Sequence, residues 1–433
     1  MKVNSEEYTK KPSRRQEAVN FPVVAIVGAG FGGLNAARTL KDSPVRVRLI
    51  DRRNYHLFQP LLYQVATAGI SPDEIAYPVR AIFRKQANLE FLLADVTGVE
   101  LDKNLLLTSF GPVHYDYLIL AVGSETNYFG LDTVAANGFD LKDLDDAEAI
   151  RNHVLFMFER ANLEVDGPTR RAMRTFVVVG GGPTGVECAG ALSELIRLVL
   201  IKDFPGLKID EARVLILERL DRILPGFPED LARAAMATLA EKHVEVHLGT
   251  GVSGYDGRQV FLESQPPIPA CTLIWAAGVR AESLVDRLGL PQGRQGRVIV
   301  QPTLQAPGYP QVFVVGDAAY LEDGAVPLPM MAPVAIQQAK VAARNVLHLI
   351  GGHPPVQFRF KDPGSLATIG RNAAVARIKG FKFHGFFAWL IWLGVHLFWL
   401  IGFRNRLLVL INWAWDYLLY ERAVRLITPE RRK

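Results

Sequence analysis

Pro22-Val-Val-Ala-Ile-Val-Gly-Ala-Gly-Phe-Gly-Gly33 is the stretch that decides the fold of the N-terminal part of the chain. An apolar, β-branched run leads into three spaced glycines, Gly28, Gly30 and Gly33. The first glycine permits a tight turn, the second lets a pyrophosphate approach the backbone, and the third lets helix and strand pack closely. A helix is expected over residues 34–40 and a strand over residues 45–50, which ends in Asp51. This order predicts a Rossmann-like dinucleotide-binding fold in which Asp51 accepts a hydrogen bond from a ribose hydroxyl.

The same pattern recurs at residues 175–185, which read TFVVVGGGPTG. Gly180, Gly182 and Gly185 take the three glycine positions, and a helix is expected to continue from residue 186. The partner strand is expected over residues 214–217, closed by Glu218, after an insertion at residues 203–211 that lengthens the crossover. Two such fingerprints in one chain predict that the protein binds two dinucleotides.

The acids that end the two partner strands bear on which dinucleotides bind. A carboxylate at this position favours a ribose 2′-hydroxyl over a 2′-phosphate. Asp51 is therefore compatible with FAD, and Glu218 indicates NADH rather than NADPH. Arg219 and Arg222 follow Glu218 closely and leave some tolerance of a phosphate open.

The charge of the chain is unevenly distributed. The 433 residues carry a net charge of +5, but the segment from Arg359 to the end holds thirteen Lys/Arg against four Asp/Glu, and the rest is mildly acidic. Five of the six tryptophans lie in the same segment. Basic residues around Trp-rich apolar stretches are typical of an element that contacts a membrane, so we do not expect a nucleic-acid partner.

The apolar stretch at residues 385–403 contains no charged residue and is long enough to span a bilayer. However, it contains His396 and three glycines, basic residues flank both of its ends, and a second apolar helix with polar residues is expected at 406–427. We therefore favour two helices lying in the plane of the membrane surface over a membrane span or a buried hairpin. His396 could donate a proton to a reduced acceptor, but a ring satisfied within the helix pair is the favoured interpretation.

The N-terminus and the cysteines indicate a cytoplasmic body. Residues 1–20 are of mixed charge without an apolar core, so they resemble neither a signal peptide nor an anchor and are expected to form a disordered arm. Only two cysteines occur, Cys188 and Cys271, which excludes a disulfide-stapled scaffold. Their spacing does not fit a redox pair, and we interpret both as packing residues.

Two further strands extend the pattern. Tyr117-Leu-Ile-Leu-Ala-Val-Gly123 ends in glycine, and Val312-Phe-Val-Val-Gly-Asp317 ends in Gly-Asp. With both fingerprints in this order, the chain resembles the two-dinucleotide-binding flavoproteins of the disulfide-reductase superfamily. The resemblance implies that Asp317 bonds the ribityl chain of FAD and that the NADH domain is inserted in the FAD domain. Residues 54–66 lack the cysteine pair of the disulfide reductases, so the electrons must leave by another route.

Within that superfamily, the chain closely resembles the type II NADH dehydrogenases, the single-subunit NADH:quinone oxidoreductases. The motifs are AIVGAGFGG, YHLFQPLLYQVATAG, VVVGGGPTGVECAG, WAAGV, FVVGDAA and the Trp-rich tail. The resemblance implies that hydride passes from NADH to FAD and that two electrons then pass to a membrane quinone without proton pumping. It places Glu187 near the nicotinamide and flavin, where a carboxylate could orient NADH or buffer a proton.

The resemblance also implies a set of binding residues. The family's Ala-Gln-x-Ala-x-Gln signature corresponds to residues 332–337, where Pro333 replaces the first glutamine, which puts direct quinone contact there in doubt. A helix over residues 334–349 could direct its N-terminus at the flavin. The expected quinone contacts are Gln337 and Gln338. The expected FAD contacts are Gly28, Ala29, Gly30, Phe31, Gly32, Gly33, Asp51, Arg52, Val96, Gly123, Asp317, Ala332 and Pro333, and the expected NADH contacts are Gly180, Gly182, Gly185, Glu218 and Gly278. No metal is expected.

The sequence thus predicts an α/β chain with two Rossmann-like domains and a C-terminal amphipathic helical region that binds the membrane. The expected division is an arm at 1–20, an FAD domain at 21–145 and 300–360, an inserted NADH domain at 146–299, and the membrane-associating region at 361–433. The enzyme is expected on the cytoplasmic face of the cell membrane, as a monomer or a homodimer. Two alternatives stay open: a flavin reductase for a soluble electron carrier, and a membrane-tethered NADH-binding sensor or scaffold.

Overall fold

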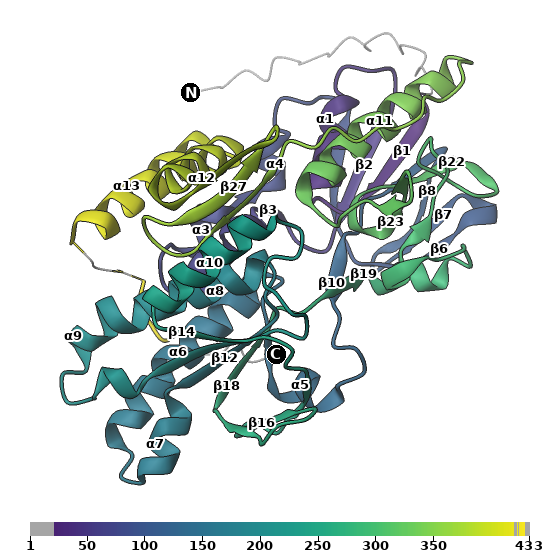
Figure 1. Ribbon diagram of the computed structural model, residues 1–433. Helices are drawn as coiled ribbons and strands as arrows, with labels where there is room; N and C mark the ends of the chain where they lie inside the picture. The colour runs from purple at the N-terminus through teal and green to yellow at the C-terminus, as the bar shows by residue number, and fades with distance from the viewer. Residues whose placement is uncertain (1–20, 420–421, 423, 429–433) are drawn as a thin grey trace, which may run out of the picture.

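The computed structural model describes residues 21–419, 422 and 424–428, and Figure 1 shows two nucleotide folds joined to a C-terminal helical region. The arm predicted for residues 1–20 lies outside the described residues.

The first nucleotide fold is built on a six-stranded sheet with the order β21-β22-β9-β1-β2-β5. Its neighbouring strands are parallel, except that β21 pairs antiparallel with β22. The strands are β1 (Val23–Val27), β2 (Arg46–Asp51), β5 (Leu89–Leu93), β9 (Tyr117–Leu120), β21 (Gln305–Ala306) and β22 (Tyr309–Val314). Helices α1 (Phe31–Thr39) and α11 (Ala332–Ile350) pack against each other beside β1 and β2 (Figure 1). The first fingerprint is therefore strand β1, the glycine turn and helix α1, and Asp51 ends β2, as predicted.

The second nucleotide fold has a five-stranded parallel sheet with the order β11-β18-β12-β13-β14. The strands are β11 (Phe139–Asp140), β12 (Thr175–Val179), β13 (Arg213–Leu217), β14 (Val244–His247) and β18 (Thr272–Trp275). Helices α6 (Leu144–Leu163), α8 (Pro183–Glu194) and α10 (Glu229–Glu241) flank it. The long crossover arises because α8 continues through a π-helical turn, Leu195–Leu200, into α9 (Ile201–Asp203).

The second fold is inserted in the first, and a two-stranded ribbon of β10 (Ser124–Thr126) and β19 (Val279–Ala281) connects them. The domain boundaries predicted at 145/146 and 299/300 are wrong. Strand β11 already belongs to the second sheet, because Phe139 pairs with Ile274. Residues from Ala281 to Val298 contribute to the core of the first fold. The ribbon places the boundaries between β10 and β11 and between β18 and β19.

The C-terminal region, here called the foot, comprises three antiparallel strands and two helices. These are β26 (Ser365–Thr368), β27 (Ala374–Ile378), β28 (Phe381–His384), α12 (Gly385–Trp399) and α13 (Phe403–Leu419). The two helices were predicted, but the second ends at Leu419 rather than at Ile427. The small sheet was not predicted, because its short strands carry no strong alternation. None of the helices in the described part of the chain is long and apolar enough to cross a bilayer.

Smaller elements connect these units. Two of the minor sheets have three strands: β6 (Val96–Glu100), β7 (Leu105–Thr108) and β8 (Gly111–His114) form one, and β15 (Val252–Tyr255), β16 (Gln259–Leu262) and β17 (Ile268–Pro269) form the other. The two-stranded sheets pair β3 (Tyr55–Leu57) with β4 (Ala76–Pro78), β20 (Val298–Ile299) with β23 (Ala319–Tyr320), and β24 (Glu322–Asp323) with β25 (Val326–Pro327). The short helices are α2 (Leu62–Ala66), α3 (Pro72–Ile75), α4 (Val79–Ile82), α5 (Asp132–Asn137) and α7 (Gly167–Met173).

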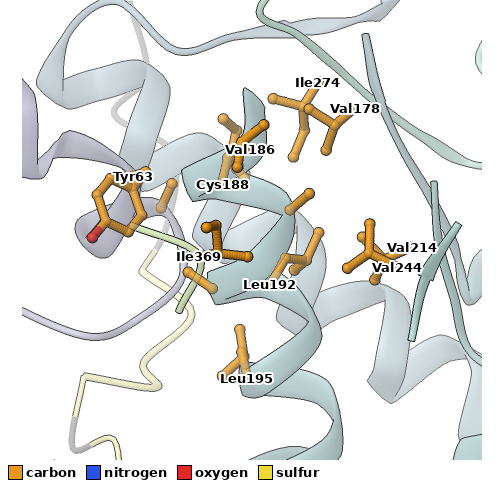
Figure 2. Packing of buried hydrophobic residues seen from close by; sticks show 14 of the residues in the cluster. Tyr63, Val178, Val186, Cys188, Leu192, Leu195, Val214, Val244, Ile274 and Ile369 are labelled. Atoms are coloured by element: carbon orange, nitrogen blue, oxygen red, sulfur yellow. The ribbon is translucent and has the colours of Figure 1, made fainter. Parts of the chain in front are cut away.

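A single hydrophobic cluster joins the foot to the second fold. It contains side chains of α8, such as Cys188 and Leu192, together with Trp392 of α12 and Val409 of α13. Figure 2 shows Cys188 and Leu192 on α8 between Tyr63 and Ile369 on one side and Val214 and Val244 on the other. The foot is thus packed into the protein core rather than attached by a linker.

Candidate active site

The first glycine of each fingerprint sits in a turn that only glycine accommodates easily. Gly28 and Gly180 have φ angles of +97° and +109°, in the left-handed region that L side chains rarely adopt. A Cβ at Gly28 would also lie 2.3 Å from the Ala121 carbonyl oxygen, and one at Gly180 would lie 2.6 Å from that of Ala276. The two turns are therefore held against the next strand of their sheets.

The other two glycines of each fingerprint have opposite surroundings. A Cβ at Gly33 would lie 1.7 Å from the Gly28 carbonyl oxygen, and one at Gly185 would lie 1.9 Å from that of Gly180. By contrast, nothing lies within 4 Å of a Cβ built on Gly30 or Gly182. The third glycine thus allows helix and strand to pack, while the middle glycine leaves the helix N-terminus open to a pyrophosphate.

The two strand-end acids take equivalent positions in the two folds. Asp51 accepts hydrogen bonds from the backbone N–H groups of Ala29 (2.5 Å) and Arg53 (2.7 Å). Glu218 accepts from those of Gly181 (2.5 Å) and Leu220 (2.8 Å). Each carboxylate therefore lies beside its glycine turn, where a ribose hydroxyl would be bound. Burial raises the pKa of Asp51, and the two backbone bonds oppose this rise.

The arginines that could tolerate an NADPH phosphate make other contacts. The Arg219 guanidinium lies 3.6 Å from the Glu263 carboxylate, and Arg222 donates to the Pro225 carbonyl oxygen at 2.5 Å.

A cavity of about 610 Å³ runs along the carboxyl ends of the first sheet. It reaches Thr184 at the start of α8, so both nucleotide folds contribute to it. Most of the expected FAD residues line it: Gly28, Ala29, Gly30, Phe31, Gly32, Asp51, Arg52, Val96, Gly123, Asp317 and Ala332. Gly33, which packs against the Gly28 turn, does not line it, and neither does Pro333, although its neighbour Ala332 does. The size and the open glycine turn fit a dinucleotide cofactor.

Polar residues that the sequence did not single out also line this cavity. Ser124 donates a hydrogen bond to Asp317 Oδ2 at 2.5 Å, and Lys142 donates to Ser124 Oγ at 2.7 Å. Arg53 pairs with Asp143, and both residues line the cavity. No sequence motif marks Ser124, which begins the connecting ribbon, or Lys142, which follows β11 of the second fold.

The two expected quinone residues do not line the cavity. Gln337 donates to the Lys361 carbonyl oxygen (2.9 Å) and accepts from the Lys361 N–H (3.0 Å), so both ends of its amide are engaged. Gln338 is buried and accepts from the Gly316 N–H at 2.7 Å, while its Nε2 has no hydrogen-bond partner among the described residues. Their geometry therefore gives no support to direct quinone contacts. Ala332 and Ala335 instead present the N-terminal turn of α11 to the cavity.

Glu187 lies on the foot side of α8 and not on the wall of the cofactor cavity. It is buried, and its Oε1 accepts from the backbone N–H of Thr368 in β26 at 3.2 Å. Burial raises the pKa of Glu187 to about 8, opposed by the Thr368 N–H and by the nearby Trp392 indole. The Trp392 Nε1 is buried and has no hydrogen-bond partner within the described part of the chain. Glu187 therefore does not line the cofactor cavity, and the location near nicotinamide and flavin that the resemblance implied stays a prediction.

A second, smaller cavity of about 90 Å³ lies between α8 and the foot. Three tryptophans line it, Trp389, Trp392 and Trp413, together with Tyr63 and Gln64 of the first fold. Its charged residues are Glu194, Arg371, Asp416 and Arg422. Asp416 has its pKa raised to about 7 by burial. The cavity thus combines aromatic walls with a buried charged end.

A row of aromatic rings connects the two cavities. Phe31, which lines the cofactor cavity, contacts Phe58 (5.9 Å between ring centroids), and Phe58 contacts His396 (6.2 Å). His396 stacks on Trp392 at 4.1 Å, and its Nδ1 lies 2.7 Å from the Trp392 carbonyl oxygen. Burial lowers the pKa of His396 to about 4, so the ring is neutral at pH 7, in agreement with the favoured structural interpretation.

Three remaining residues take structural positions. A Cβ at Gly278, an expected NADH contact, would lie 2.7 Å from the Phe129 ring, so this glycine permits that packing. Cys188 is buried, and burial raises the pKa of its thiol to about 12. Cys271 is also a free cysteine, and burial raises its pKa. Neither thiol is activated, which agrees with the packing roles expected for both.

The outer face of the foot carries a group of exposed apolar side chains. Phe387 of α12 is 74% exposed and Phe403 of α13 is 82% exposed. Their exposed neighbours on the two helices and on β28 are Phe381, Phe383, Phe386, Leu390, Phe398, Trp399, Leu407, Leu410, Ile411, Trp415, Leu418 and Leu419. A group of exposed apolar side chains gathered on two helices and one strand marks a contact surface.

The chain has clear relatives among known proteins. Residues 22–339 match the pyridine nucleotide-disulphide oxidoreductase family, and residues 363–420 match the NDH2 C-terminal domain. The chain is 40% identical to the type II NADH:quinone oxidoreductase Ndh of Mycobacterium tuberculosis, over 98% of this chain and 93% of that protein. It is 38% identical to NdhA of the same organism, over 94% and 89%. The structure of NDH2 from Plasmodium falciparum in complex with NADH has the same fold, with a TM-score of 0.86 at 21% identity, over 94% of this chain and all of that chain.

Proposed function

The chain belongs to the type II NADH:quinone oxidoreductases, and we propose that its two nucleotide folds hold FAD and NADH while the foot attaches the enzyme to the membrane surface from which the quinone enters. The enzyme transfers electrons from NADH to a quinone and uses FAD as its cofactor. The flavin, when bound, accepts hydride from NADH and passes two electrons on without proton pumping.

The chain's own residues would divide the binding between them. The Gly28–Gly33 turn and α1 would hold the FAD pyrophosphate, with Asp51 on the adenosine ribose and Asp317 on the ribityl chain. The open turn at Gly182 and the Glu218 carboxylate would hold NADH. The first turn of α11, which faces the cofactor cavity, would stabilise negative charge on the reduced flavin.

The single observation that carries the membrane assignment is the exposed apolar face of α12 and α13. These helices are short, and they bury Trp392 and Val409 inward while phenylalanines such as Phe387 and Phe403 face outward. This arrangement supports a foot that lies in the headgroup region. The aromatic row from His396 through Phe58 to Phe31 supports a quinone approach from the foot. The unpaired cysteines suit the cytoplasmic face of the cell membrane.

The test compares charged variants of the foot with a matched control. F387E and F403E should bind vesicles of phosphatidylcholine and phosphatidylglycerol about 10- to 100-fold more weakly, because each removes roughly 1.5–3 kcal/mol of apolar burial. F110E is the control, since Phe110 is 84% exposed but lies between β7 and β8 of the first fold. All three variants should reduce a short-chain, water-soluble quinone at nearly the wild-type rate.

Two results would contradict the proposal. Vesicle binding by F387E and F403E at wild-type strength would remove the membrane assignment of this face. A flavin-loaded protein that oxidised NADH only with a ferredoxin-type carrier, or with no acceptor, would instead support the soluble-carrier or sensor alternatives.

A further inference from the structure

A chain of three polar groups crosses the connection between the two nucleotide folds. Lys142 Nζ donates to Ser124 Oγ at 2.7 Å, and Ser124 Oγ donates to Asp317 Oδ2 at 2.5 Å. Asp317 follows β22 in the first fold, Ser124 begins β10 of the connecting ribbon, and Lys142 follows β11 of the second fold. All three line the cofactor cavity.

The backbone of Lys142 is fixed from both sides. Its N–H donates to Asp146 Oδ2 at 3.0 Å, within the capping box that begins α6. Its carbonyl oxygen accepts from Gln59 Nε2 of the first fold at 2.9 Å. The Lys142 backbone is therefore held at both its N–H and its carbonyl group, and this fixes the point from which the ammonium group reaches Ser124.

The charges around the chain show that this lysine is not a solvated surface residue. Burial lowers the pKa of Lys142, and the Asp317 and Asp146 carboxylates oppose this by favouring the charged form. Asp317 also acts electrostatically on buried Arg297 and favours its charged form by raising its pKa, while the Arg297 guanidinium donates to the Leu328 and Ala319 carbonyl oxygens. Lys142 is partly buried, and an ammonium group withdrawn from water is costly unless it is paired, so its link through Ser124 to the Asp317 carboxylate offsets that cost.

We propose that Lys142 is a positioning residue for FAD, acting through Ser124 to orient the Asp317 carboxylate toward the ribityl chain. Ser124 occupies Oδ2, which leaves Oδ1 as the acceptor for a ribityl hydroxyl. The inference rests on the proposed function, because it takes Asp317 as the ribityl ligand. The inference adds that Lys142, a residue of the inserted second fold, completes the FAD site of the first fold. FAD retention should therefore depend on the position of the two folds relative to each other.

The test is a double-mutant cycle on FAD release from the holoenzyme, followed by the recovery of free FAD fluorescence after dilution. K142M and S124A should each accelerate release about tenfold. The double variant should release FAD no faster than the faster single variant, because both changes break the same chain. K142R should restore release to within about threefold of wild type, since it keeps a charged donor. K340M is the matched control, because Lys340 is an exposed lysine on α11, and it should leave release unchanged.

Three outcomes would overturn the inference: wild-type release by K142M, additive effects of K142M and S124A, or equal effects of K142M and K142R. If K142M does not fold, K142Q, which keeps a polar side chain but lacks the charge, takes its place in the cycle with S124A. Wild-type protein that neither retains nor takes up FAD would instead contradict the proposed function itself. The two failures are therefore distinguishable.

Discussion

Single carboxylates carry much of the specificity that we assign to this enzyme, and Glu218 is the clearest case. Its two oxygens already accept from the N–H groups of Gly181 and Leu220, which orients the carboxylate at the edge of the second glycine turn. An anion held there would repel a 2′-phosphate while it accepts from a 2′-hydroxyl.

We therefore expect E218Q to raise the KM for NADH about tenfold, which corresponds to about 1.4 kcal/mol. The same change should improve the relative kcat/KM for NADPH, because it removes the repulsive charge. The measurement is steady-state NADH and NADPH oxidation with a short-chain quinone. E241Q serves as the control, since Glu241 is exposed at the end of α10. An unchanged NADH/NADPH ratio in E218Q would refute this role.

The buried Glu187 carboxyl leads to a prediction of a different kind, which concerns how the free energy of unfolding depends on pH. Its pKa is raised to about 8 in the folded protein, mainly by burial, from an ordinary value of 4.5. Between these values, the folded state holds a proton that the unfolded chain has lost, so the free energy of unfolding falls as pH rises. Above about pH 8 the full cost of the buried anion is present.

E187Q cannot ionise, so the stability of this variant relative to wild type should increase by about 1 kcal/mol per pH unit between pH 5 and 8. Thermal unfolding followed by circular dichroism at several pH values measures this difference. The raised carboxylates Asp146 and Asp416 are present in both proteins and cancel. Parallel pH profiles would show that Glu187 is ionised in the folded protein.

At the scale of elements, the strand–turn–helix unit of each fold depends on close packing at its third glycine. A methyl group at Gly185 would lie 1.9 Å from the Gly180 carbonyl oxygen, which would force α8 away from β12. The corresponding contact at Gly33 lies in the first fold.

G185A should therefore retain FAD but raise the KM for NADH at least tenfold, whereas G33A should lose FAD. Flavin absorbance of the purified protein and NADH titration separate the two effects. G206A is the control, because Gly206 is exposed and nothing lies within 4 Å of its Cβ position. Loss of FAD from G185A would show that α8, which reaches the cofactor cavity at Thr184, also supports FAD binding.

The foot is also an element whose two faces have opposite roles. Trp392 is 1% exposed and packs in the cluster shared with α8, whereas Trp415 is 52% exposed on α13. Polar contacts reinforce this attachment, since Asn405 donates to the Asp73 and Glu74 carbonyl oxygens of α3 and Lys382 pairs with Asp230 of α10.

At the scale of the whole molecule, the foot therefore stabilises the nucleotide folds as well as contacting lipid. W392A should lower the free energy of unfolding by about 3–5 kcal/mol, as expected for a large buried aromatic side chain. W415A should cost less than about 0.5 kcal/mol but weaken vesicle binding. Chemical denaturation and vesicle sedimentation measure the two effects. Equal stability of W392A and W415A would contradict a shared core.

Because the foot shares a hydrophobic core with the second fold, a truncation of the foot would affect stability as well as membrane attachment. Removal of residues from about 380 onward would expose the inward side of the cluster, including the surroundings of Cys188 and Leu192 (Figure 2). Loss of membrane attachment would then be accompanied by loss of stability. Point variants on the outer face separate the two.

The sequence by itself determined the two nucleotide folds, their order, the strand-end acids and the apolar foot. These depend on local geometry, because the spacing of Gly28, Gly30 and Gly33 describes one turn and its helix, and Asp51 ends the strand that must follow. Gly28 to Gly32 and Asp51, which line the FAD cavity, belong to this unit, whereas Arg52, Val96, Gly123, Asp317 and Ala332 followed from the family resemblance.

Only the tertiary structure decided the contacts of the other site residues. These contacts join side chains that are far apart in the sequence. Lys142 reaches Asp317 through Ser124, and Glu187 turns toward Thr368 and the foot instead of the cofactor cavity. Gln337 is bound to the Lys361 backbone, which no spacing in its helix reveals. A local pattern specifies a turn or a helix face, but which partner a side chain finds is set by the packing of whole elements.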